Sequence, residues 1–124
     1  MTGEFEHRPW GAWYVLDEGE GYKVKRIEVA PGQRLSYQTH EHRSEHWVVV
    51  AGTATCVIDG GELVVGVNET LFVEVGQAHR ITNMHDERLV IVEIQAGPYL
   101  GEDDICRLED DYGRHEAGAN SDQA

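Results

Sequence analysis

The chain has 124 residues, 40% of them apolar, with five Tyr and three Trp, which is enough for one domain with a single hydrophobic core. Ten Lys and Arg against 23 Asp and Glu give a net charge of −13, which disfavours general nucleic-acid binding and means that any anionic ligand needs a local basic cluster. Two cysteines, Cys56 and Cys106, cannot build a disulfide framework, and no leader-like or membrane-spanning run is visible, so we expect a cytoplasmic protein.

Between its two ends, the sequence predicts short strands separated by Gly- and Asp-rich turns. Residues 1–7 show no periodic apolar pattern and are expected to form a loose N-terminal arm. The acidic run at 102–104 predicts the start of a short helix, and the C-terminal end predicts a disordered tail. An all-β chain of this kind is typical of a small β-barrel or jelly roll. The predicted strands cover residues 13–16, 22–29, 45–50, 52–57, 62–67, 70–75 and 89–95, with a bend at 43–44 and a hairpin turn at 59–61.

Alternation along these strands separates inward from outward side chains. In the strand at 45–50, Glu45 shares a face with Trp47, whereas His46 lies on the other face and is a poor candidate for a ligand. In the strand at 22–29, Lys25 shares the face of Ile27, and the pattern alone favours an ammonium group that extends to the rim or lies outside.

Residues 32–52, GQRLSYQTHEHRSEHWVVVAG, gather three of the seven histidines beside a carboxylate, which suggests a metal site. Two registers are open. Either Gln38 and His40 precede Glu45, or His40 and His42 do. Residues 38, 40 and 42 would share one face of an extended strand, so alternation does not choose between the two registers.

The first register resembles the first motif of the cupin family, which is a Gly, five residues, a His-x-His pair, three or four residues, a Glu, six residues and a Gly. Gly32, His40, Glu45 and Gly52 match these intervals, and Gln38 stands where most cupins have the first histidine. The resemblance therefore implies that Gln38, and not His42, is the first metal ligand.

A second stretch resembles the second cupin motif, which is Gly, five residues, then Pro-x-Gly-x2-His-x3-Asn. Gly76, His79 and Asn83 match it, whereas Asn68 replaces the first Gly and Glu74 replaces the Pro. Asn can adopt the positive φ that such a turn needs, and the Pro acts as a rigidifying residue rather than a ligand. The departures therefore concern the geometry of the turn, and the match implies that His79 is a ligand.

The spacing Gln-x-His-x4-Glu resembles the ligand pattern of the type II, cupin-type mannose-6-phosphate isomerases. In that family the cupin is commonly the C-terminal part of a longer protein that begins with a mannose-1-phosphate guanylyltransferase. The resemblance implies a cupin domain at residues 8–114, with an arm at 1–7 and a disordered tail at 115–124. The segments that carry it are RPWG at 8–11, GYKVKRIEVAPG at 21–32, HRSEHWVVVAGTA at 42–54 and GPYLGEDDICRLEDDYGR at 97–114.

By this resemblance, the protein would interconvert mannose 6-phosphate and fructose 6-phosphate by moving a proton between C1 and C2 through an enediol. One divalent metal ion is implied, with zinc expected and Mn, Co, Ni or Fe as alternatives. Such a set of nitrogen and oxygen ligands leaves coordination positions for water or substrate. The implied ligands are Gln38, His40, Glu45 and His79; the candidate proton shuttles are Lys25 and His42; and the candidate phosphate-binding residues are Arg43 and Arg80, with Arg26 as a third possibility.

A homodimer is expected, because small β-barrels commonly cover an edge strand with a second copy, and a separate guanylyltransferase chain is a further expected partner. The family resemblance also implies a role in carbohydrate metabolism and polysaccharide biosynthesis. Three other interpretations stay open at this point. They are a metal-free barrel that binds a ligand through polar residues, a different metallo-cupin enzyme such as a dioxygenase, and a non-catalytic sugar-phosphate sensor.

Overall fold

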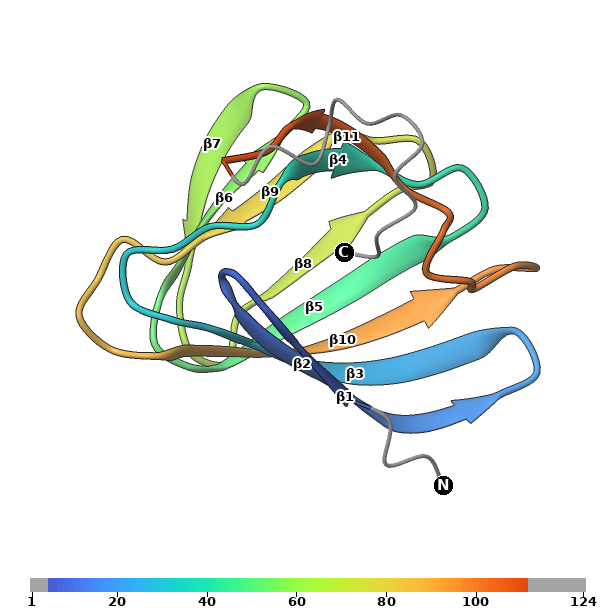
Figure 1. Cartoon of the computed structure of the whole chain (residues 1–124), viewed down its shortest axis with the longest axis horizontal. Coiled ribbons are helices and arrows are strands. Elements are labelled where there is room, and N and C mark those ends of the chain that lie inside the picture. The colour runs from blue at the N-terminus through green and yellow to red at the C-terminus, as the bar shows by residue number, and fades with distance from the viewer. Residues whose placement is uncertain (1–4, 112–124) are drawn as a thin grey trace.

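The protein folds into two antiparallel β-sheets that face each other and form a small barrel (Figure 1). The structure is a computed structural model and describes residues 5–111. The strand order is β1-β2-β3-β10-β5-β8 in one sheet and β11-β4-β9-β6-β7 in the other, which confirms the expected all-β jelly-roll class. The strands are β1 Phe5–Arg8, β2 Gly11–Gly19, β3 Tyr22–Val29, β4 Tyr37–Thr39, β5 Ser44–Ala51, β6 Ala54–Ile58, β7 Gly61–Val65, β8 Thr70–Val73, β9 His79–Thr82, β10 Leu89–Ala96 and β11 Cys106–Glu109.

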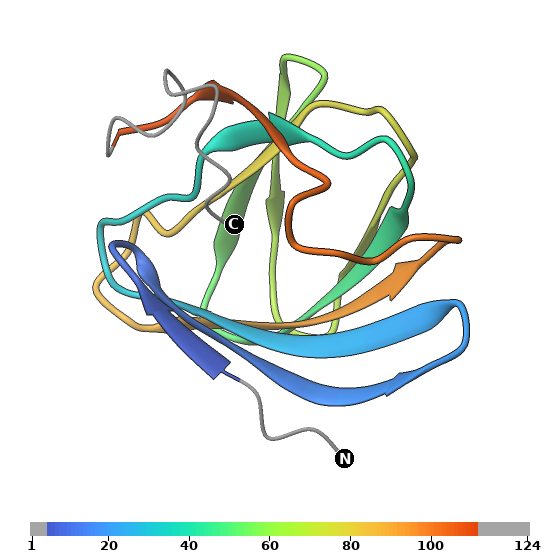
Figure 2. The same cartoon turned by 45° about the vertical axis from the view of Figure 1, so that its right-hand side comes forward.

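The hydrophobic core lies between the inner faces of the two sheets. Trp13, Val29 and Ile91 contribute from the larger sheet, and Cys56 and Ile81 from the smaller one, all 3% exposed or less. Burial of one large apolar side chain stabilises the fold by about 1.5–3 kcal/mol. Figure 2, which turns the molecule by 45°, shows the curved sheets enclosing this interior. The same inner faces therefore also hold any polar residue that falls at an inward position.

Two turns require positive φ at residues other than glycine. Asn68 has a φ of 72°, as expected for a residue at the position of a motif glycine, and Asp59 has a φ of 48° in the hairpin turn that joins β6 to β7. Asn and Asp tolerate this conformation better than other side chains, which explains their presence at these turns.

The loose arm expected at residues 1–7 is wrong for residues 5–7, which belong to a strand. Phe5–Arg8 forms β1, which pairs with β2 from Phe5 opposite Tyr14 to Arg8 opposite Gly11. The ring of Phe5 stacks on that of Tyr14 with 5.5 Å between centroids. This aromatic contact holds β1 on the edge of the sheet, and the alternation of apolar residues in the sequence does not reveal it. The expected tail at 115–124 lies outside the described residues.

The predicted helix at 102–104 is wrong, because Glu102 and Asp103 form a turn and β11 follows from Cys106. The bend expected at 43–44 is also displaced and falls at Glu41 and His42. One carboxylate accounts for both corrections. The side chain of Asp104 accepts hydrogen bonds from the main-chain N–H groups of Glu41 and His42, each at 3.0 Å, which holds the bend and uses the Asp104 carboxylate outside any helix.

The connection from β10 to β11, residues 97–105, crosses from the larger sheet to the smaller one beside the β4–β5 turn (Figures 1 and 2). Its first residue, Gly97, lies so close to the main chain of His42 and Arg43 that a Cβ atom would overlap the carbonyl oxygen of His42. Glycine is therefore required at this close approach. Residues 5–111 contain no helix with the length and apolarity that crossing a bilayer requires.

Candidate metal centre

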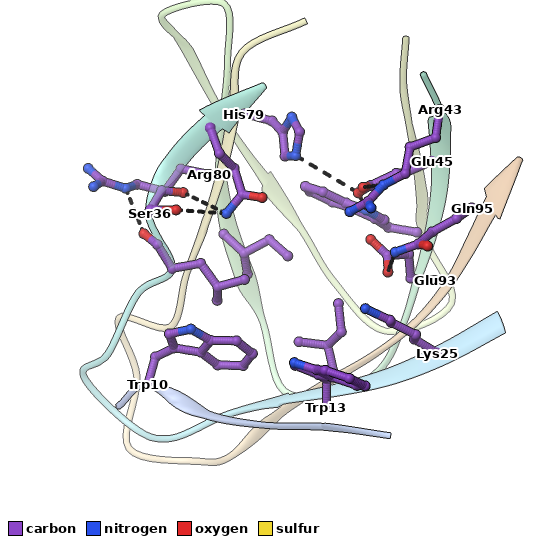
Figure 3. Close-up of a pocket in the computed structure, with 15 residues that line it drawn as sticks. Trp10, Trp13, Lys25, Ser36, Arg43, Glu45, His79, Arg80, Glu93 and Gln95 are labelled. Atoms are coloured by element: carbon purple, nitrogen blue, oxygen red, sulfur yellow. Dashed lines mark hydrogen bonds and ion pairs between the residues drawn. The ribbon is translucent and has the colours of Figure 1, made fainter. Parts of the chain in front are cut away.

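Three motif residues that are far apart in sequence converge inside the barrel. His40 directly follows β4, Glu45 lies in β5, and His79 is the first residue of β9. Their side chains offer one donor atom each, and these atoms lie within 4.8 Å of one another. All three residues are 4% exposed or less, and Figure 3 shows His79 directed toward Glu45. The strands that carry the two sequence motifs therefore build one buried cluster.

Main-chain carbonyl groups orient both imidazole rings. His40 Nδ1 lies 2.6 Å from the carbonyl oxygen of Asp104, and His79 Nδ1 lies 2.9 Å from that of Gln77. A carbonyl oxygen only accepts hydrogen bonds, so each Nδ1 carries the proton and each Nε2 keeps its lone pair. Both Nε2 atoms face Glu45, at 3.2 Å for His40 and 3.9 Å for His79. This is the outer-shell arrangement that prepares histidine for metal binding.

Electrostatics keep the cluster in a metal-binding protonation state. Burial lowers the pKa of His40 to about 4, so its imidazole is neutral at neutral pH. Burial alone would raise the pKa of Glu45, but the Arg43 guanidinium, together with His40, His79 and a hydrogen bond from Glu93, holds that pKa well below the usual value. Glu45 also accepts hydrogen bonds from Arg43 Nε and Trp47 Nε1, each at 2.9 Å. A neutral imidazole next to an ionised carboxylate suits a divalent cation.

The donor spacing fits one ion. Ligand atoms stand about 2.0–2.3 Å from zinc, and therefore about 3.3–3.7 Å apart in a tetrahedral site. Glu45 Oε2 lies 3.2 Å from His40 Nε2, and the other carboxylate oxygen, Oε1, lies 3.9 Å from His79 Nε2, both close to that range. The set contains no thiolate, because Cys56 belongs to the hydrophobic core and Cys106 is exposed on β11. Two imidazoles with a carboxylate suit zinc, manganese, iron, cobalt or nickel alike.

The placement of Gln38 favours the first of the two registers. Gln38 lies opposite His79 in the pairing of β4 with β9, and it is 4% exposed. Its Nε2 donates to the Oγ of Ser36 at 2.8 Å, which commits the amide nitrogen and leaves the amide oxygen as the group for a metal. By contrast, the side chain of His42 is 52% exposed and lies at the bend, with Nδ1 3.3 Å from Asp104 Oδ1.

Lys25 lines the same pocket. It is 2% exposed, on the inner face of β3 as the alternation predicts. Its Nζ lies 2.5 Å from Glu102 Oε2 and 4.1 Å from the centroid of the Trp13 ring. Figure 3 shows the ammonium group extending into the pocket. His42, the other candidate shuttle, lines a separate surface cavity beside Tyr99.

The arginines occupy different positions. Arg43 is buried within the cluster, where its Nη2 lies 3.2 Å from His40 Nε2. Arg80 lines the pocket wall, but its Nε donates to the Leu35 carbonyl at 3.0 Å and its Nη1 pairs with Glu109. Arg26 lies outside the pocket, in a surface pair with a neighbouring glutamate of β3. Of the candidate phosphate residues, Arg43 is thus the one that contacts the cluster of His40 and Glu45.

Four acidic or amide residues of the site escaped sequence reasoning. On the predicted strand at 89–95, Glu93 and Gln95 share the inner face with the core residues Leu89 and Ile91, a signal that was available from period-two alternation. Glu93 donates a hydrogen bond to Glu45, and burial together with that neighbouring carboxylate raises its pKa well above the usual value. Glu102 and Asp104 reach the site from the 97–105 connection, and no local pattern marks them.

Comparison with known proteins places the chain in a family. The sequence profile described as mannose-6-phosphate isomerase C-terminal matches residues 2–110. The chain belongs to this family. Two relatives of this isomerase-family domain are the mannose-1-phosphate guanylyltransferase ManC of Salmonella typhimurium, 49% identical, and the alginate biosynthesis protein AlgA of Pseudomonas aeruginosa, 47% identical, each over 87% of the chain. The chain spans only 22% of the length of either relative.

Solved structures show that the fold of this isomerase-family domain is a cupin. The capsular polysaccharide assembling protein CapF of Staphylococcus aureus matches with a TM-score of 0.74 at 19% identity, over 86% of this chain and 34% of that one. A sugar phosphate isomerase of the cupin superfamily from Silicibacter pomeroyi matches with a TM-score of 0.63 at 18% identity, over 68% and 58% of the two chains. The expected cupin fold is therefore confirmed.

Proposed function

We propose that this domain is a metal-dependent aldose–ketose isomerase that interconverts mannose 6-phosphate and fructose 6-phosphate. The observation that carries the proposal is the buried cluster of His40, Glu45 and His79, with both Nε2 atoms facing the carboxylate. Membership of the isomerase C-terminal family supports the choice of substrate. A ligand set of nitrogen and oxygen atoms without thiolate, in a pocket lined by further ionisable groups, is typical of a catalytic rather than a structural metal site.

The residues fit one divalent ion, held by Gln38, His40, Glu45 and His79, with zinc as the expected metal. When bound, such an ion supplies Lewis acidity toward the carbonyl and hydroxyl oxygens of the sugar, worth several kcal/mol of charge stabilisation.

Proton transfer between C1 and C2 requires a group that faces the pocket. Lys25 meets this requirement, because its ammonium group is buried in the pocket, whereas His42 opens toward solvent. We assign the shuttle to Lys25. Glu102, its ion-pair partner, fixes the position of the ammonium group.

Arg43 is the first candidate for phosphate binding. The Nε of Arg43 donates to Glu45, which is also a proposed metal ligand, so we assign the other N–H groups of the guanidinium to the phosphate oxygens. Arg80 would reach phosphate only by exchanging its contacts with Leu35 and Glu109. The net charge of −13 opposes the approach of a sugar phosphate, and screening beyond about 8 Å at physiological ionic strength weakens that repulsion. Turnover at low substrate should therefore rise with moderate salt.

The wider context is also proposed. The relatives named above are a guanylyltransferase and an alginate biosynthesis protein, which supports a role in polysaccharide biosynthesis and a separate guanylyltransferase chain as a partner. The free thiols of Cys56 and Cys106 are compatible with the reducing cytoplasm expected from the sequence.

The decisive experiment measures isomerase chemistry and binding on the same preparation. Metal-loaded protein is incubated with mannose 6-phosphate in deuterated water, and deuterium at C2 is followed by NMR together with a coupled assay for fructose 6-phosphate. We expect exchange and turnover that the Glu45→Gln variant loses. Binding of mannose 6-phosphate without exchange at any salt concentration would replace this function with a sugar-phosphate sensor, and oxygen uptake would indicate a dioxygenase.

A further inference from the structure

Gln95 has a buried hydrogen-bond acceptor without a donor. It lies on the inner face of β10 with no exposed surface, and Figure 3 shows its amide pointing into the pocket next to Glu93. The Nε2 of Gln95 donates to Glu93 Oε1 at 3.0 Å, which fixes the orientation of the amide. Its Oε1 has no hydrogen-bond partner among residues 5–111.

Buried polar atoms are almost always paired, because an unpaired one loses its hydration without compensation. No donor among residues 5–111 reaches the Gln95 Oε1. Lys25 binds Glu102, and Arg43 binds Glu45. We therefore expect a bound ligand to supply the hydrogen-bond donor for the Gln95 Oε1 at the pocket wall.

The chemistry of an amide oxygen restricts that ligand group. It accepts hydrogen bonds and cannot donate, so it matches a hydroxyl and not the oxygens of an ionised phosphate. Gln95 lies directly opposite Glu45 in the pairing of β10 with β5, which places it next to the metal cluster. The matching hydroxyl thus belongs to the reacting end of the sugar.

We propose that Gln95 is a specificity-determining residue whose Oε1 accepts a hydrogen bond from the C3 hydroxyl of the sugar phosphate. This inference rests on the proposed isomerase function. The carbon that carries the C3 hydroxyl is bonded to C2, one of the two reacting carbons, and this hydroxyl is present in both mannose 6-phosphate and fructose 6-phosphate, so the contact persists through the reaction. Gln95 would then select sugars that carry this hydroxyl.

The test is a coupling experiment between one side chain and one hydroxyl. All three tryptophans of the chain line this pocket, so their fluorescence reports binding directly. The Kd values of mannose 6-phosphate and of its 3-deoxy and 4-deoxy analogues are measured on metal-loaded wild type and on Gln95→Met, a variant of similar size without an acceptor. Ile94→Val is the matched control, because Ile94 is the neighbouring residue of β10 and faces outward.

One neutral hydrogen bond changes a Kd by about 3- to 10-fold. We expect Gln95→Met to raise the Kd of mannose 6-phosphate by that factor and to leave the Kd of the 3-deoxy analogue unchanged. The Kd of the 4-deoxy analogue should rise as much as that of mannose 6-phosphate. Ile94→Val should alter none of the three. Wild type alone should bind the 3-deoxy analogue more weakly than the parent by the same factor, a comparison that does not depend on the folding of a mutant.

Two results would overturn the inference while leaving the isomerase proposal intact. One is an equal loss for all three sugars in Gln95→Met, which would mean that Gln95 only supports Glu93. The other is a wild type that turns over mannose 6-phosphate but binds the 3-deoxy analogue equally well, in which case water satisfies the acceptor. A wild type that neither binds nor turns over mannose 6-phosphate would overturn the isomerase proposal and this inference together.

Discussion

The ion pair between Lys25 and Glu102 joins the inner face of β3 to the 97–105 connection and is open to a stability test. Glu102→Gln keeps the size of the side chain but removes its charge. The side chains of Lys25 and Glu102 are 3% and 15% exposed, so the variant leaves a buried ammonium group without its main counter-ion. Breaking a buried pair costs about 3–5 kcal/mol. The Trp13 ring, whose centroid lies 4.1 Å from Lys25 Nζ, stays in place and offers the ammonium group a cation–π contact, so we expect the lower value, about 3 kcal/mol.

Urea unfolding followed by tryptophan fluorescence measures this loss. The double variant Lys25→Met with Glu102→Gln should recover most of it, because no unpaired charge is left, and a double-mutant cycle isolates the interaction. A loss below about 1 kcal/mol in Glu102→Gln alone would show that the pair behaves like a solvated surface contact. In that case Glu102 could not be what positions the ammonium group.

The same pair predicts an acid dependence of stability. Burial would raise the pKa of Glu102, but the Lys25 ammonium group, together with Arg43 and Lys23, holds the pKa below the usual value. A carboxyl whose pKa is lowered by folding stabilises the protein above its unfolded pKa of about 4.3, and that stabilisation is lost as the pH falls through the lower folded value. Wild type should therefore lose stability below about pH 4 more steeply than Glu102→Gln. Parallel curves for the two proteins would contradict this cause.

Three further predictions concern the metal and the assembly. His79→Ala should retain the circular dichroism of wild type while losing more metal affinity than the 10- to 100-fold typical of outer-shell changes, and full metal content with normal turnover would exclude His79 as a ligand. A crystal structure with zinc should place the Gln38 amide oxygen about 2.0–2.2 Å from the ion, and His42 at that position would reverse the register. Light scattering should show a homodimer at tens of micromolar, because Phe72 on the edge strand β8 is 47% exposed, and a monomer would count against it.

Local rules predicted those parts of the site that depend on strand alternation. The alternation of inward and outward residues correctly placed Glu45 inside and His46 outside in β5, and it put Lys25 on the face of Ile27 in β3, although the pattern alone favoured an ammonium group at the rim where the structure buries it. The turn at Asn68 followed from the conformational freedom of one residue type. In each of these cases the physical cause lies within a few residues of the feature that it explains.

Contacts between distant segments could not be predicted in this way. Asp104 decides where the chain bends at Glu41 and His42, more than 60 residues earlier, and Glu102 pairs with Lys25 across 77 residues. The acidic run at 102–104 looks like the start of a helix because the sequence does not reveal these partners. The long-range contacts of the Glu102 and Asp104 carboxylates outweigh the local preference of this run for a helix.

The carbonyl groups of Asp104 and Gln77, which hold the two ligand histidines, have a consequence for mutational scanning. No side-chain substitution deletes a carbonyl, so a scan at residue 104 would report only the role of the carboxylate in anchoring the bend. The path of the main chain sets the orientation of each imidazole, so the side chains at residues 77 and 104 could change without altering that orientation. Backbone chemistry can address the acceptor itself: an ester in place of the peptide bond between Asp104 and Ile105 would weaken the carbonyl while leaving every side chain unchanged.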